Sequence, residues 1–362
     1  MGPDNRGFFA AILAGGAGTR FWPASRRATP KPFLDLFGRG PLVALTRARV
    51  APVVENDSIF FVLGESLKPA LEKACPGAVG IGEPIARNTL GAVLIALGHV
   101  LAHDPAGRLA ILPADHVIGN EVRFQQTLRD AFVLAERYVV TLGVRPSYAE
   151  TGYGYIKSDE RSLDHCPAGI NGLPVAEFTE KPDLARAEQF VAGGSHFWNA
   201  GIFVLPAARF TEIARGVDPY FGEVVDRTAK ATREGALSQA LLQELLEPLP
   251  NTNIDKAVME HCPELAVIPA DFPWSDVGTW DAAFDERERG AENLVVGDSR
   301  VLGGTGNVAV SMNGAPALVL QNVDDLIVVV TEDAVLVTRK GTGQEVGKVV
   351  DVLRKAGRDE LM

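Results

Sequence analysis

Short apolar runs alternate with longer amphipathic segments from residue 8 to about residue 205, which is typical of βα units on a parallel sheet. Apolar runs bounded by small or polar residues predict three buried strands, Phe8–Leu13, Ser58–Leu63 and Leu109–Leu112. Apolar residues at helical spacing predict helices over Thr89–His103, with Asn88 as its N-cap, and over Phe124–Ala135. These helices would connect neighbouring strands across a face of the sheet.

The pattern becomes mixed further along the chain, with strand-like pieces over residues 139–144, 152–158, 174–182 and 265–270. Helical patterns cover residues 183–192 and 206–262. From Asn293 to Val337 the sequence runs in short β-like stretches separated by turns, and helical spacing returns at Gln344–Lys355. We therefore predict an α/β fold of Rossmann-like type, with a mixed, mostly parallel sheet flanked by helices. The predicted domains are residues 1–288, which carry that sheet, and residues 289–362, which form a small β-rich domain ending in a helix.

Composition narrows the class of protein. The 362 residues carry a formal net charge of −11 with no block of Lys and Arg, which argues against a nucleic-acid-binding protein. The three cysteines are too few and too scattered for a disulfide framework or a zinc site, and they fit a reducing cytoplasm. The N-terminal apolar run Phe8–Leu13 is too short for a signal peptide or a membrane span. We expect a cytoplasmic protein with no nucleic-acid or membrane partner.

The segment LAGGAGTRFWPASRRATPKPF, residues 13–33, follows the first predicted strand directly. It contains three glycines, Gly15, Gly16 and Gly18. Glycines allow a close backbone approach that side chains would block, so this loop could aim several N–H groups at phosphate oxygens, with Arg20 and Lys31 adding positive charge. The segment is neither a Walker A loop nor a GxGxxG motif. The alternative is that the glycines form only a tight connection.

Two carboxylates are candidate metal ligands. Asp115 lies just past a predicted strand, at the edge where open α/β sheets bind ligands. Mg²⁺ usually takes one or two protein carboxylates together with nucleotide phosphates, and Asp276, in PWSDVGTW, is the candidate partner. The alternative for Asp115 alone is an N-cap or a solvated turn. The six histidines show no ligand spacing, and we assign them structural or surface roles.

Three further polar residues could meet a sugar phosphate. Glu180 and Lys181 are adjacent, so one could face a ligand hydroxyl while the other faces phosphate, although such pairs are usually solvated. Asn199, in HFWNAGIFV, is flanked by aromatic and apolar residues, so it is expected to be buried and to need polar partners. Sugar hydroxyls could be those partners, and the alternative is an Asn that satisfies a turn.

Ordered motifs carry a resemblance to a known family: LAGGAGTR-FWPASR, PKPFL, GEPIARNT, LPADH, ETGYGYI, FTEKPD, FWNAGIFV, NIDKAVME and WSDVGTW. Together they resemble the sugar-1-phosphate nucleotidylyltransferases, and within these the mannose-1-phosphate guanylyltransferases, densely over roughly residues 8–285. The general family needs only the first and fourth motifs. The preference for guanine and mannose depends on GEPIARNT, FWNAG and WSDVG.

The resemblance implies a role for each matching position. Arg20 would bind the triphosphate, Lys31 would contact the phosphates near the reacting centre, and Asp115 with Asp276 would hold Mg²⁺, which makes Arg20, Lys31 and Asp115 the catalytic residues. The nucleotide would be bound by Gly15, Gly16, Gly18, Thr19, Glu83, Arg87 and Asn88. The sugar phosphate would be bound by Gly154, Glu180, Lys181 and Asn199.

The resemblance also implies GTP and mannose 1-phosphate as the substrates. The sugar phosphate would attack the α-phosphorus of GTP and release pyrophosphate, with catalysis by positioning and charge stabilisation. Three alternatives stay open: the same transfer with another nucleotide or sugar 1-phosphate, an NAD-dependent dehydrogenase, and a non-catalytic paralogue that binds a nucleotide sugar.

The family's C-terminal region resembles a short left-handed β-helix, with which the β-rich tail is compatible, and exposed apolar strands there make a homodimer plausible. Longer relatives carry an isomerase domain, and because this chain stops at Met362 we expect that activity to be absent. The sequence departs from the family's usual pattern at Pro32, Gly91 and the run NTNID. These departures put fine base or sugar contacts in question.

Overall fold

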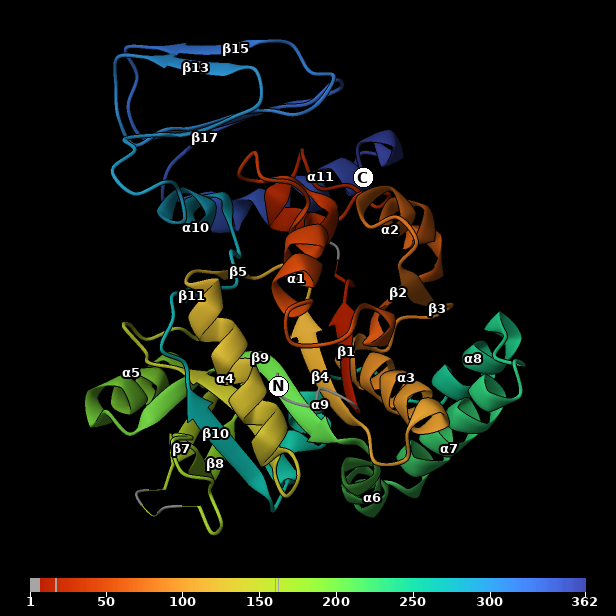
Figure 1. Cartoon of the computed structure of the whole chain (residues 1–362). Helices are drawn as coiled ribbons and strands as arrows, with labels where there is room; N and C mark the ends of the chain where they lie inside the picture. Colours follow the sequence, from red (N-terminus) through yellow and green to blue (C-terminus); the bar gives the residue numbers. More distant parts are fainter. Residues whose placement is uncertain (1–6, 17, 160, 162) are drawn as a thin grey trace.

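The computed structural model describes residues 7–16, 18–159, 161 and 163–362, so Ala17 of the glycine-rich segment lies outside it. A nine-stranded sheet forms the centre of the molecule (Figure 1). Its strands are β1 Phe8–Leu13, β2 Ile59–Gly64, β3 Val79–Glu83, β4 Arg108–Pro113, β6 Val139–Val144, β7 Tyr155–Ser158, β8 Leu173–Thr179, β9 His196–Pro206 and β10 Leu265–Pro269. They lie in the order β3-β2-β1-β4-β9-β6-β10-β8-β7.

The sheet is mixed, with parallel and antiparallel pairings in similar number. β3, β2, β1 and β4 pair in parallel, as do β6 and β10, while β8 and β9 are antiparallel to their neighbours. This mixture confirms the predicted mixed sheet, but parallel pairings do not predominate as predicted. The antiparallel β9 lies against β4, so the sheet changes direction next to the edge where β1 and β4 end.

Helices cover both faces of the sheet. The helices are α1 Leu42–Val50, α2 Lys68–Ala74, α3 Asn88–His103, α4 Glu121–Leu134, α5 Leu184–Gly193, α6 Ala207–Val217, α7 Pro219–Arg233, α8 Gln239–Leu246, α9 Ile254–Ala257, α10 Trp280–Asp285 and α11 Val346–Lys355. α3, α6, α7 and α8 pack on one face, and α1, α2 and α4 pack on the other. β1 serves both layers, because Ala10 and Ile12 enter one apolar cluster while Ala11 enters the other.

A second, β-rich unit follows α10. Its strands are β12 Leu294–Val296, β13 Ser299–Leu302, β14 Val308–Ser311, β15 Leu318–Gln321, β16 Leu326–Val330 and β17 Val335–Arg339. β12, β14 and β16 pair in parallel, β13 pairs in parallel with β15, and β17 adds antiparallel to β16. Successive strands thus alternate between two sheets, and Figure 1 shows this unit stacked above the end of the molecule that carries α1 and α10.

The β-rich unit shares an apolar cluster with the segment that follows β1. Phe21 and Trp22 from that segment pack with Trp280 of α10, Val346 of α11 and Ile327 of β16. The cluster therefore crosses the boundary predicted between residues 288 and 289. That boundary stays a prediction, but the two parts are joined by a common core.

Most of the predicted elements are confirmed, with one error at a helix end. The predicted strands at residues 8–13, 58–63 and 109–112 correspond to β1, β2 and β4. Asn88 is not the N-cap of α3: it is the helix's first residue, with a φ of 55°, and its side chain accepts a hydrogen bond from the N–H of Thr89. Among the described residues, no helix combines the length and the apolar character that crossing a bilayer requires.

Candidate active site

A cavity of about 490 Å³, here called the edge cavity, opens where β1 and β4 end. Leu13 and Pro113, the last residues of these strands, are paired, so the loops that follow start side by side. Gly15 and Gly16 line the cavity on the β1 side, and Asp115 lines it on the β4 side. The structure therefore places the glycine-rich loop and the first candidate carboxylate at one edge, as parallel strands require.

Lys31 connects the two candidate metal ligands. Its Nζ donates a hydrogen bond to Oδ2 of Asp115 at 2.8 Å and another to the backbone carbonyl of Asp276. The Lys31 side chain is only 7% exposed, so this ammonium is held in place rather than solvated. Burial alone would raise the pKa of Asp115, but the neighbouring Lys31 ammonium outweighs it, and the pKa lies below its ordinary value. Asp115 is therefore ionised at neutral pH.

Arg20 lies at the same edge, beside Asp276. Nη1 of Arg20 and Oδ2 of Asp276 are each 3.4 Å from the position that a Cβ on Gly278 would take. Gly18 makes another close approach, because a Cβ there would lie 2.6 Å from Cβ of Lys31. The φ of Gly18 is +57°, which a residue with a side chain rarely adopts. The glycine thus lets the loop pass directly against Lys31.

Two residues that the sequence analysis did not select hold this edge together. The hydroxyl of Tyr153 donates to Oδ1 of Asp276 at 2.7 Å, and burial, followed by the charge of Asp276, raises the pKa of Tyr153. The indole N–H of Trp274 donates to Nδ1 of His116 at 3.2 Å. Burial lowers the pKa of His116, which fits a neutral ring that accepts at Nδ1. Both contacts fix groups next to the carboxylates.

A polar network lies on the far side of the edge cavity. The amide of Asn199 donates from Nδ2 to Oδ1 of Asp255 at 2.7 Å, and its Oδ1 accepts from the hydroxyl of Thr141 at 3.0 Å. Asp255 lines the cavity, and burial, reinforced by the charge of Glu180, raises its pKa to about 7. Glu180 accepts a hydrogen bond from Asn253 at 2.8 Å. Asn199 is thus buried as expected, with protein partners.

Glu83 ends β3 and lines the edge cavity. Its Oε1 is buried and has no hydrogen-bond partner in the described structure. Burial raises the pKa of this carboxyl to about 7. An unpaired buried acceptor is costly, so Glu83 is suited to a ligand that brings N–H donors to it. Asn88 lines the cavity nearby.

The donor set at Asp115 and Asp276 fits Mg²⁺. Within the described residues, no three or more His, Cys, Asp or Glu side chains cluster in a way that could hold a metal ion by themselves. Two carboxylates are what Mg²⁺ typically takes from a protein when substrate phosphates and water complete its shell. The residues present are therefore compatible with a magnesium ion shared with a nucleotide.

Comparisons with known proteins identify the family of this chain. A family model described as nucleotidyl transferase matches residues 9–292. The chain belongs to the nucleotidyl transferase family. Xanthan biosynthesis protein XanB of Xanthomonas campestris pv. campestris (strain B100) is 36% identical over 358 residues, which cover 96% of this chain and 74% of that protein. Mannose-1-phosphate guanylyltransferase 2 of Escherichia coli O157:H7 is 34% identical over 367 residues, which cover 98% of this chain and 75% of that protein.

A solved structure supports the same fold. It is described as a mannose-1-phosphate geranyltransferase from Thermus thermophilus, with a TM-score of 0.83 and 32% sequence identity. The similarity covers 96% of this chain and 99% of that one. Because coverage extends past residue 292, this nucleotidyl transferase shares its C-terminal β-rich unit with the relative as well as its sheet.

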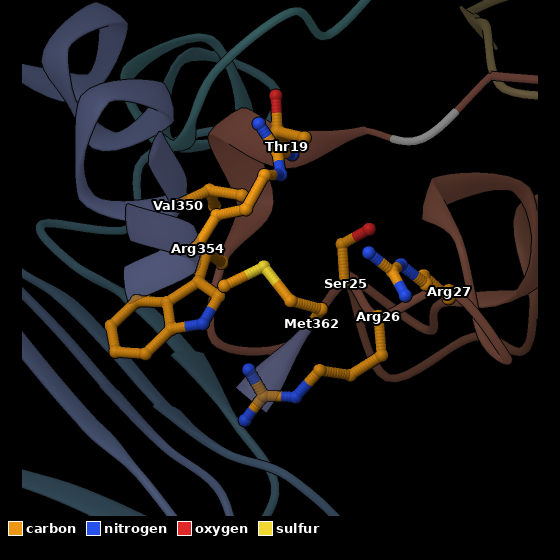
Figure 2. A pocket seen from close by; sticks show the side chains of 8 residues that line it. Thr19, Ser25, Arg26, Arg27, Val350, Arg354 and Met362 are labelled. Atoms are coloured by element: carbon orange, nitrogen blue, oxygen red, sulfur yellow. The ribbon is translucent and has the colours of Figure 1, made fainter. Parts of the chain in front are cut away.

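Some predicted site residues lie away from the edge cavity. Arg87 donates instead to the carbonyls of Leu246 and Glu247 at the end of α8. Thr19 faces α11, as Figure 2 shows. Lys181 is 58% exposed in its side chain and pairs with Glu180 at 3.3 Å. The binding roles of these residues in the transferase remain predictions.

Other residues at the site were missed, although they lie inside motifs that were recognised. Asp255 belongs to NIDKAVME and Tyr153 to ETGYGYI. Nothing in the local sequence shows that either side chain reaches this edge of the sheet. Gly154 was selected, and a Cβ there would lie 2.7 Å from Oε2 of Glu180 and 3.3 Å from Cβ of Asn199, so its place in the network depends on close packing.

Proposed function

We propose that this chain is a mannose-1-phosphate guanylyltransferase, which forms GDP-mannose and pyrophosphate from GTP and mannose 1-phosphate. A phosphate oxygen of the sugar phosphate forms a bond to the α-phosphorus of GTP, and the bond from that phosphorus to the leaving pyrophosphate breaks. The main support is the contact of Lys31 with both Asp115 and Asp276 at the rim of the edge cavity. The named relatives supply the choice of nucleotide and sugar.

Charge is the main obstacle to this reaction, because both substrates are anions. Two unit charges 4 Å apart repel by about 4 kcal/mol at an effective dielectric constant of about 20. Lys31 and Arg20 would supply positive charge where the two phosphates meet, and the buried, hydrogen-bonded Lys31 would need no reorganisation during the step. Mg²⁺ held by Asp115 and Asp276 would neutralise further phosphate charge and orient the oxygens for in-line attack.

Glu83 is proposed to recognise the guanine base. Guanine presents two adjacent donors, N1–H and the N2 amino group, that can pair with one carboxylate. The unpartnered Oε1 of Glu83 supplies such an acceptor in the edge cavity. Adenine and the pyrimidines found in nucleoside triphosphates lack this donor pair, so they would leave the carboxylate unpaired.

The network of Asn199, Asp255 and Glu180 is proposed to meet the sugar. Carboxylate oxygens accept hydrogen bonds from hydroxyl groups, and Asp255 already lines the cavity. Asn199 fixes the orientation of Asp255 through its Nδ2. Lys181, at the exposed end of the same network, would pair with the sugar's phosphate.

The test is a pyrophosphate-release assay with purified protein, Mg²⁺ and paired substrates. We expect release with GTP and mannose 1-phosphate to exceed that with UTP or dTTP and with glucose 1-phosphate. A higher rate with another pair would reassign the substrates and keep the reaction class. Binding of GDP-mannose without any turnover would overturn the proposal.

The proposed setting is a homodimer in the cytoplasm. The three cysteines form no disulfide in the described structure, as a reducing compartment requires. β17 is the last strand of its sheet, paired with β16 on one side only in the described structure. Its Val335 and Val337 are 58% and 62% exposed. An exposed apolar edge strand suits pairing with a second copy. We also propose that the coils of β12 to β16 wind as a left-handed β-helix, in line with the family resemblance.

A further inference from the structure

The segment that carries Arg20 and Lys31 packs against the C-terminal part of the chain. Phe21 and Trp22 do not enter either cluster of the central sheet; they pack with Val346 and Val350 of α11. A Cβ on Gly347 would lie 3.8 Å from Cγ of Arg20, so the first turn of α11 runs along the stem of this arginine. The helix therefore lies beside a proposed catalytic side chain.

Hydrogen bonds add to this packing at the end of the chain. The carbonyl of Leu361 accepts from the indole N–H of Trp22 at 3.0 Å and from Nη1 of Arg26 at 2.6 Å. Nη2 of Arg26 reaches Asp333, beyond β16, at 2.8 Å. One carbonyl thus holds two side chains of the segment, and Arg26 also ties the segment to the β-rich unit.

Figure 2 shows the two sides of this contact facing each other. Thr19, Arg26 and Arg27 lie on the N-terminal side, and Val350, Arg354 and Met362 lie on the C-terminal side. A small cavity of about 90 Å³ remains between them. The two segments are therefore in contact but leave a small gap between them. The hydrogen bonds to Leu361 join the segments beside this gap.

We infer that α11 and the turn after it, residues 346–362, form a latch that holds residues 19–33 so that Arg20 and Lys31 point at the reacting phosphates. Trp22 and Arg26 are positioning residues of this latch, not catalytic residues. The physical reason is that the preceding glycines leave the segment with little intrinsic stiffness, while displacement of a catalytic group by about 1 Å can cost about 10²-fold in rate. The kinetic part of this inference rests on the proposed function.

Three variants of the full chain test the latch. Trp22→Phe removes the N–H and keeps an aromatic ring, Arg26→Met removes the donors and keeps an apolar stem, and deletion of residues 359–362 removes the acceptor carbonyl. The matched control is Arg227→Met, which removes ion pairs to Glu223 and Glu244 on the surface of α7 and α8. Each protein is measured by steady-state kinetics and by amide hydrogen exchange over residues 19–33.

For the three latch variants we expect exchange over residues 19–33 to accelerate about tenfold and kcat/KM for GTP to fall about tenfold, with the control unchanged. Combining Trp22→Phe with the deletion should lower kcat/KM little further than the deletion alone, because both changes remove the same hydrogen bond between Trp22 and Leu361. Unchanged exchange and kinetics in all three variants would overturn the latch. If the wild-type protein transferred no nucleotide, the proposed function would fail, and the exchange data would still decide whether the latch holds the segment.

Discussion

Lys31 is the residue on which the proposed chemistry depends most directly. Lys31→Ala removes the ammonium that bonds the carboxylate of Asp115 and the backbone carbonyl of Asp276, so Asp115 loses its counter-charge. We expect kcat to fall by about 10²–10³-fold, as is usual when one preorganised charge-stabilising donor is lost. Initial rates of pyrophosphate release at saturating substrate provide the measurement.

The matched control for Lys31 is the exposed Lys230 of α7. Lys230→Ala changes the net charge of the protein by the same amount, but the lost charge lies on an exposed helix. The rate of this variant should therefore stay within about twofold of the wild-type rate. Near-native turnover in Lys31→Ala, with a circular dichroism spectrum like that of the wild type, would contradict the assigned role.

Glu83 predicts how nucleotide binding depends on pH. Burial raises the pKa of its carboxyl to about 7, and guanine donors require the ionised form. Below pH 7 the group is increasingly protonated in the free protein, so binding must release a proton and the affinity for GTP weakens as pH falls. As the pH falls from 8 to 6, protonation of Glu83 should raise the apparent KM for GTP about tenfold.

GTP itself titrates near this range, so Glu83→Gln is measured beside the wild type. The variant keeps the titration of the nucleotide and loses that of residue 83, and the difference between the two pH profiles isolates the carboxyl. The variant should also discriminate less between GTP and other triphosphates. Parallel pH profiles for the two proteins would argue that Glu83 does not contact the base.

Gly18 tests the close passage of the loop beside Lys31. An alanine there would adopt a φ of +57° and place Cβ 2.6 Å from Cβ of Lys31, so the loop or the lysine must move. Gly18→Ala should lower kcat by at least about tenfold and destabilise the protein by about 1–3 kcal/mol. Gly216→Ala is the comparison, since nothing lies within 4 Å of its Cβ position and its backbone needs no positive φ. Urea unfolding measures the stability of both variants, and pyrophosphate release measures their kcat. Equal losses in Gly18→Ala and Gly216→Ala would refute the steric argument.

The residues of the site were predictable from sequence to different degrees. Gly18 and Asp115 each come soon after a buried strand, so the sheet brings them to one edge. Lys31 reaches that edge only through the long segment after β1. Tyr153, Thr141 and Asp255 of α9 reach the site through long-range packing, of which the local sequence carries no sign. The unexpected contacts of Arg87 with α8 have the same origin, because they are long-range.

At the scale of elements, apolar runs identified β1, β2 and β4 because these strands are buried on both faces and form continuous apolar stretches. The parallel edge strand β3, with the sequence VGIGE, was not predicted, because two glycines interrupt its apolar run and its first residue is exposed. β9 was harder, since HFWNAGIFVLP contains a glycine with positive φ and a polar asparagine in the middle of the strand. Both irregular residues lie at the site, where Gly201 lines the edge cavity. The strand's local pattern is thus disturbed where it meets the proposed substrate.

α10 provides a prediction about stability at the element scale. Its Asp281 accepts hydrogen bonds from the backbone N–H groups of Gly341 and Gly343, which lie between β17 and α11. Asp281→Ala leaves these donors without their partner and should lower the free energy of unfolding by about 1–3 kcal/mol. Because Asp281 does not touch the edge cavity, kcat at low temperature should change little. Chemical denaturation measures the first quantity, and an unchanged midpoint would show that solvent replaces the carboxylate at no cost.

At the scale of the whole molecule, the shared cluster decides whether the two predicted domains behave as separate bodies. Phe21, Trp22 and Leu34 on one side of residue 288 pack with Val308 and Ile327 on the other. A chain that ended at residue 288 would expose these apolar side chains to water. The sequence pattern predicted a change from α/β to β-rich structure along the chain, but such a change says nothing about whether the two parts bury a common surface.

The shared cluster predicts cooperative unfolding of the full chain. Trp22 and Trp280 lie in the cluster while Trp198 and Trp274 lie near the sheet's far strands, so tryptophan fluorescence reports on both parts. We expect its thermal transition to coincide with that of far-ultraviolet circular dichroism, as in a two-state system. The fragment 1–288 should aggregate or unfold at a much lower temperature than the full chain under the same conditions. A soluble fragment with its own sharp, unshifted transition would mean that the proposed catalytic edge is stable without the β-rich unit, and the segment bearing Arg20 and Lys31 would then need another anchor.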